Sequence, residues 1–172
     1  VSDDEGGPAD GGRRPAVRTV AVISGKGGVG KSVVVTNVAI ACARRGRRVL
    51  LVDGDLSLAN VDLLMGLIPR RNLADVIYRQ VPIEEVVLET PSGVRLLPAA
   101  AGIEALANLD EYRLEHLLRE LSRLEETCDL ILLDTPTGIG AQALHLASVA
   151  ETTLIVTTPE PTAFSDAYAT LK

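Results

Sequence analysis

Short, continuous apolar runs separated by longer amphipathic segments limit what this chain can fold into. Because apolar and polar residues do not alternate within them, the runs are typical of strands that are buried on both faces. The runs are Val20–Ile23, Val49–Val52, Val94–Leu97, Leu130–Leu133 and Leu154–Val156. A helix is expected to begin near Asp110, where leucines follow at helical spacing, and another over Ser32–Arg45. This alternation predicts a doubly wound α/β fold, with a mainly parallel sheet and helices on both faces.

The composition indicates one ordered domain in a reducing, cytoplasmic setting. The 172 residues are 47% hydrophobic and 23% charged, which is enough to build a sizeable core. Aromatic residues make up 2% and the net charge is −6, so a nucleic-acid-binding surface is not expected. Cys42 and Cys128 do not have the spacing of a metal site. Residues 1–18 are rich in glycine, proline and mixed charge, which predicts a flexible tail before a domain at 19–172.

A glycine-rich sequence follows the first predicted strand. Residues 25–32, GKGGVGKS, match G-x-x-x-x-G-K-[ST] between a predicted strand and a predicted helix. Glycines let successive backbone N–H groups point at a phosphate, and the helix that follows adds its positive N-terminus. We expect Lys31 to contact the β- and γ-phosphates and Ser32 to bind Mg²⁺. The predicted nucleotide-binding residues of this loop are Gly25, Lys26, Gly27, Gly28, Val29, Gly30, Lys31 and Ser32.

Aspartates follow two further predicted strands. Asp53 and Asp55 come after one strand, and Asp134 comes after another. Carboxyl ends of parallel strands meet at one edge of a sheet, so these side chains are expected to face the phosphate loop. There an aspartate can hold a metal ion or orient an attacking water. The alternative is that they cap turns, as isolated aspartates usually do.

Together these segments resemble the MinD/ParA ATPases. SGKGGVGKS at 24–32 is similar to their deviant Walker A loop, which has a second lysine early in the loop, here Lys26. DGDLSLANVDLLMGLIP at 53–69 resembles the switch I region of the FlhG/FleN flagellar-number regulators and their MinD relatives. Further similarity lies in LPAAAG at 97–102, DTPTGIGAQALHLAS at 134–148 and TTPEPTAFSDAY at 157–168. The resemblance runs from about residue 19 to the end and favours the FlhG/MinD branch.

The resemblance implies an ATPase whose catalytic residues are Lys26, Lys31 and Asp55. Lys26 would reach the phosphates of a partner copy, so that ATP joins a homodimer, and Asp55 would position the hydrolytic water. Asp53 and Asp134 would complete the cofactor site, with Ser32, Asp53 and Asp134 serving Mg²⁺. Positions that match dimer or partner contacts of the family are Asn60, Asp62, Glu160 and Asp166.

The biology that the resemblance implies is slow, dimerisation-coupled ATP hydrolysis that sets flagellar number or placement through a protein partner. Two alternatives stay open: a ParA- or MinD-type positioner of chromosomes or division sites, and an ATP-binding recruitment module without useful hydrolysis. Because relatives continue for roughly another hundred residues, we expect this chain to be truncated at its C-terminal side. Attachment at the inner membrane or cell pole would then depend on a segment beyond Lys172.

Overall fold

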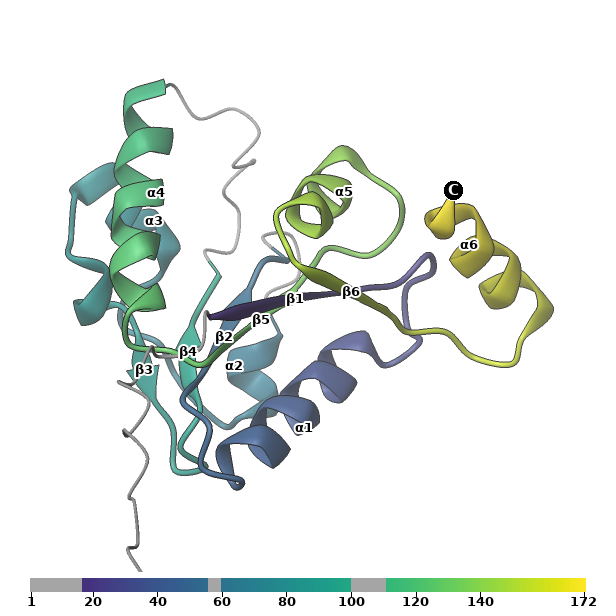
Figure 1. Ribbon diagram of the computed structural model, residues 1–172, viewed down its shortest axis with the longest axis horizontal. Helices are drawn as coiled ribbons and strands as arrows, with labels where there is room; N and C mark the ends of the chain where they lie inside the picture. Colours follow the sequence, from purple (N-terminus) through teal and green to yellow (C-terminus); the bar gives the residue numbers. More distant parts are fainter. Residues whose placement is uncertain (1–16, 56–59, 100–110) are drawn as a thin grey trace, which may run out of the picture.

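The computed structural model describes residues 17–55, 60–99 and 111–172, in which one sheet lies between two layers of helices (Figure 1). Within these residues the strand order is β3-β4-β2-β5-β1-β6. All neighbouring strands are parallel except β3 and β4. The strands are β1 (Arg18–Ile23), β2 (Val49–Asp53), β3 (Leu88–Glu89), β4 (Arg95–Leu97), β5 (Leu130–Asp134) and β6 (Thr152–Ile155). The predicted α/β class and mainly parallel sheet are therefore confirmed.

Helices connect the strands and cover both faces of the sheet. α1 (Lys31–Ala43) and α2 (Val61–Leu64) lie on one face, and α3 (Leu73–Arg79), α4 (Glu111–Glu125) and α5 (Ala141–Ser148) on the other (Figure 1). α6 (Pro161–Leu171) follows β6, and a single 3₁₀ turn, η1, spans Ile83–Glu85. The expected helix over Ser32–Arg45 is α1, one to two residues shifted at its ends. Asp110, expected near the start of α4, lies outside the described residues.

The continuous apolar runs are explained by the two cores on either side of the sheet. In β2, Leu50 packs in the core beneath α3 and α4, whereas its neighbour Leu51 packs in the core beneath α1. Both side chains are fully buried. Burying a leucine stabilises the fold by about 1.5–3 kcal/mol, so both faces of the strand contribute to stability.

Two edge strands differ from the sequence-based expectation. β3 was not predicted, because its two residues form no apolar run and pair with β4 only across a tight turn at Thr90–Gly93. The run Leu154–Val156 was expected to be buried on both faces, and this is wrong. Leu154 is 41% exposed, because β6 lies at the edge of the sheet beside β1. In the described part of the chain, no helix is long and apolar enough to cross a membrane.

Candidate nucleotide-binding site

The glycine-rich loop joins β1 to α1 at the carboxyl edge of the sheet. Gly28 and Gly30 have positive φ angles of 80° and 88°, a backbone region that residues with a side chain rarely adopt. A Cβ atom built on either glycine would meet no atom within 4 Å, so the space next to this part of the loop is open. α1 begins directly after Gly30, which places the positive end of a 13-residue helix next to this opening. An open glycine cradle at a helix N-terminus fits a nucleotide phosphate.

Lys31 and Asp134 form a buried ion pair beneath the loop. The Lys31 Nζ atom lies 2.5 Å from Asp134 Oδ1, and the two side chains are 3% and 1% exposed. A lysine of α1 is thus bound to the last residue of β5. A phosphate bound in the loop would compete with the Asp134 carboxylate for this ammonium group.

Asp53 lies beside Asp134, but within the described residues its carboxylate forms no ion pair like the one between Asp134 and Lys31. The two residues are register partners at the ends of β2 and β5. The Asp53 carboxylate accepts hydrogen bonds from the backbone N–H groups of Asp55, at 3.2 Å, and Val61, at 3.4 Å. Burial raises the pKa of Asp53 to about 6, and the negative charge of Asp134 adds to this effect. Such a carboxyl group retains its proton under mildly acidic conditions, and a nearby cation would favour its ionised form.

The structure therefore brings together the acids that the sequence placed at strand ends. Asp53, Asp55 and Asp134 are all buried at the edge that carries the loop, and Ser32 lies half-buried in the first turn of α1. In the described parts of the chain, no three His, Cys, Asp or Glu side chains are placed to hold a metal ion unaided. A Mg²⁺ ion commonly takes one or two protein oxygens and completes its shell with phosphate and water. Ser32 with Asp53 or Asp134 fits that requirement.

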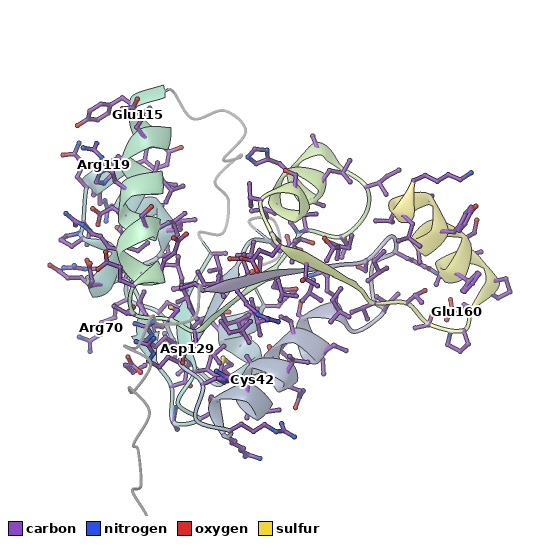
Figure 2. The ribbon with its side chains drawn as sticks, viewed as in Figure 1. Cys42, Arg70, Glu115, Arg119, Asp129 and Glu160 are labelled. Atoms are coloured by element: carbon purple, nitrogen blue, oxygen red, sulfur yellow. The ribbon has the colours of Figure 1, made fainter. Side chains whose placement is uncertain are left out.

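Lys26 occupies a different position from Lys31, at the outer rim of the loop. Its ammonium group donates to Glu160 Oε2 at 2.8 Å and to Thr162 Oγ1 at 3.1 Å, both at the start of α6. The Lys26 side chain is 39% exposed and that of Glu160 is 63% exposed. Glu160 lies at the opposite end of the sheet from Asp129 (Figure 2). The hydrogen bond from Lys26 holds the pKa of Glu160 below its usual value. Thr162 was not singled out from the sequence, although it lies two residues after Glu160.

α6 and the segment after β5 both contact the start of the loop. A Cβ on Gly25 would lie 2.5 Å from the carbonyl carbon and oxygen of Asp166, so α6 packs directly on the loop backbone. The Gly138 N–H donates to the carbonyl oxygen of Ser24 at 2.8 Å. Gly138 has a φ of 90°, as a turn at this point requires. The loop is thus bordered by two segments that are far from it in the sequence.

The two remaining predicted contact residues lie at α2. Asn60 is exposed and immediately precedes the helix, and the Asp62 carboxylate accepts a hydrogen bond from the Leu63 N–H at 2.8 Å. Residues 56–59, which connect Asp55 to Asn60, lie outside the described residues. The Asp62 carboxylate is thus bound to the next residue of the chain, and its role in partner contacts stays a prediction.

Comparison with known proteins decides the family. The family model described as "ParA: NUBPL iron-transfer P-loop NTPase" matches residues 16–172. The chain belongs to the ParA family of P-loop NTPases. The antiactivator FleN of Pseudomonas aeruginosa is 44% identical over 156 residues, which cover 91% of this chain and 56% of FleN. The flagellum site-determining protein YlxH of Helicobacter pylori is 33% identical and covers 89% of this chain and 52% of YlxH.

Solved ParA-family structures have the same fold. MinD of Pyrococcus horikoshii, complexed with Mg-ADP, is 31% identical to this chain, with a TM-score of 0.71. The match covers 87% of this chain and 61% of the MinD chain. A chain of the MinC:MinD complex of Aquifex aeolicus is 31% identical to this chain, with a TM-score of 0.75. The match covers 90% of this chain and 62% of that Aquifex chain. The chain spans little more than half the length of the curated relatives it matches.

Proposed function

We propose that this chain is a Mg-ATP-dependent dimerising switch that hydrolyses ATP slowly and thereby sets the number or placement of flagella. The observation that carries the proposal is the separation of two lysines around one phosphate loop. Lys31 is buried beneath the loop, whereas Lys26 lies exposed at its rim. In this proposal Lys31 binds the chain's own nucleotide, and Lys26 binds a nucleotide held by a second copy.

The side chains of the site support hydrolysis by water. Lys31 leaves Asp134 to bind the phosphates, and the backbone N–H groups of residues 27–30 donate hydrogen bonds to the same phosphates. Bound Mg²⁺ supplies positive charge that stabilises the transferred phosphoryl group. Asp55 orients the water that attacks the γ-phosphorus, while the bond to ADP breaks in line. Ser32, Asp53 and Asp134 are the residues proposed to hold the metal.

Dimerisation requires Lys26 to exchange partners. In the structure its ammonium group is bound to Glu160 and Thr162 of the same chain. To reach the phosphates of a second copy, Lys26 must leave these oxygens. A surface ion pair of this exposure contributes less than about 1 kcal/mol, so the exchange has a small cost.

The flagellar role is supported by the relatives named FleN and YlxH. A second candidate, a positioner of division sites that acts through a protein partner, is supported by the similarity to MinD and to the MinC:MinD complex. Both roles use the same nucleotide chemistry in the cytoplasm, with peripheral attachment at the inner membrane or pole. Deletion of the gene distinguishes them, because changed flagellar number supports the first role and misplaced septa support the second.

A recruitment module that binds ATP without useful hydrolysis is tested by a turnover assay. Phosphate release by the wild type, with and without its cellular partner, is compared with that of Asp55→Ala, which should retain nucleotide binding. We expect the variant to lose at least tenfold in turnover, because one water-orienting group contributes at least about 1.4 kcal/mol to the barrier. Equal rates for the two proteins would favour the recruitment module.

A further inference from the structure

Ser24 is a fully buried residue whose hydroxyl group has no use in the site described above. It follows β1 directly, precedes the phosphate loop and is 0% exposed. Its Oγ atom has no hydrogen-bond partner in the part of the chain that the structure describes. A buried hydroxyl without a partner destabilises the state that contains it, whereas alanine would occupy the same space without that cost. The choice of serine here is therefore unfavourable in the arrangement that the structure shows.

Ser24 also lies where three segments of the site meet. Its carbonyl oxygen accepts from Gly138, and the next residue, Gly25, presses against the backbone of Asp166. Two residues earlier, in β1, the carbonyl of Val22 accepts from both the N–H and the hydroxyl of Thr135, at 3.2 and 3.0 Å. Ser24 is thus bound through its backbone to the segment after β5, and the loop residue that follows it contacts α6.

The arrangement shown is one in which Lys31 is bound to Asp134. A phosphate in the loop competes for the Lys31 ammonium group, which loosens the connection between the start of α1 and the end of β5. Those two elements flank the residue that precedes the loop. A rearrangement of α1 and β5 around a bound phosphate would change the surroundings of the Ser24 hydroxyl.

We propose that Ser24 is a positioning residue for nucleotide binding: its hydroxyl has no partner while Lys31 is bound to Asp134, and gains a main-chain partner from residues 25–30 or 135–138 when a nucleotide occupies the loop. The inference rests on the nucleotide binding of the proposed function. It adds a residue that favours the nucleotide-bound arrangement by destabilising the alternative.

Thr36 provides a matched control. Its hydroxyl is also buried without a partner in the described residues, and its side chain is 5% exposed. Unlike Ser24, it lies inside α1, five residues after Lys31, and not at the junction of the three segments. Thr36→Val removes this hydroxyl with almost no change of shape. We expect this change to act equally with and without nucleotide.

The experiment measures urea unfolding without nucleotide and the Kd for Mg-ADP by calorimetry, for the wild type, Ser24→Ala and Thr36→Val. Ser24→Ala is expected to unfold at higher urea than the wild type and to bind Mg-ADP about tenfold more weakly, or about 1.4 kcal/mol. Thr36→Val is expected to keep the wild-type Kd. The inference is overturned if Ser24→Ala keeps the wild-type Kd, if it unfolds at lower urea or fails to fold, or if Thr36→Val weakens binding equally. Wild-type protein that does not bind Mg-ADP would instead contradict the proposed function.

Discussion

Two neighbouring aspartates at the carboxyl edge of the sheet have different surroundings, and this difference has measurable consequences. Asp134 is bound to a buried ammonium group, whereas the Asp53 carboxylate accepts from the backbone N–H groups of Asp55 and Val61. Their positions could be predicted from the sequence, because parallel strands bring their last residues together. Which of them pairs with Lys31 could not, since both follow apolar runs of similar length.

At the residue scale, Asp53 should make the free energy of unfolding decrease as pH rises. Its pKa is about 6 in the folded chain and 3.8 as an ordinary aspartate, so the folded state holds the proton more tightly. The free energy of unfolding must then decrease as pH rises from about 4 to about 6, by up to about 3 kcal/mol. Asp53→Asn removes the charge, so we expect it to match the wild type near pH 4 and to exceed it by about 1–3 kcal/mol at pH 8. Urea unfolding at the two pH values, without Mg²⁺ or nucleotide, measures this difference, and a difference that does not change with pH would contradict it.

The buried ion pair should show strong coupling between its two members. Asp134→Asn leaves the Lys31 ammonium group buried opposite a neutral amide, which we expect to reduce the free energy of unfolding by about 3–5 kcal/mol. The double variant Lys31→Met, Asp134→Asn removes both charges of the pair and should lose less stability than Asp134→Asn alone. Denaturant unfolding of Lys31→Met, Asp134→Asn and the double variant forms the cycle. If the double variant were less stable than either single variant, the pair would not be coupled as described.

At the scale of elements, the contact between α6 and the phosphate loop depends on Gly25. Gly25→Ala places a methyl group 2.5 Å from the Asp166 backbone, so α6 must move away. We expect a loss of about 1–3 kcal/mol in stability and weaker nucleotide binding. Gly140→Ala is the control, because Gly140 lies outside the loop, has a φ of −64° and its methyl group would meet no atom within 4 Å. Thermal unfolding and nucleotide titration of both variants provide the comparison, and equal effects would show that α6 does not restrict the loop.

The elements that could be predicted from the sequence are those with long or continuous apolar patterns. β2, β5 and α1 agree with the expectation to within two residues. The short elements α2, α3 and β3 were missed, because four, seven and two residues carry too little periodicity. The contact between Lys26 and α6 joins residues 134 positions apart, and no local pattern encodes such a pair.

At the scale of the whole molecule, the proposed switch depends on what the exposed Lys26 side chain does when two copies meet. The chain contains three lysines: Lys31 beneath the loop, Lys26 at its rim, and Lys172 at the end of the chain, above the ring of Tyr168. The glycine-rich motif predicted the phosphate loop, and the resemblance of further segments predicted the family. It could not show that Lys26 stays outside the buried part of the site.

Light scattering after size-exclusion chromatography, with Mg²⁺ and a non-hydrolysable ATP analogue, tests this claim most directly. The wild type and Lys172→Ala should elute at twice the mass of the monomer. Lys26→Ala should remain monomeric while binding the analogue within about threefold of the wild-type Kd, since Lys31 and the loop backbone are unchanged. A Lys26→Ala protein with the same dimer fraction as the wild type would contradict the account.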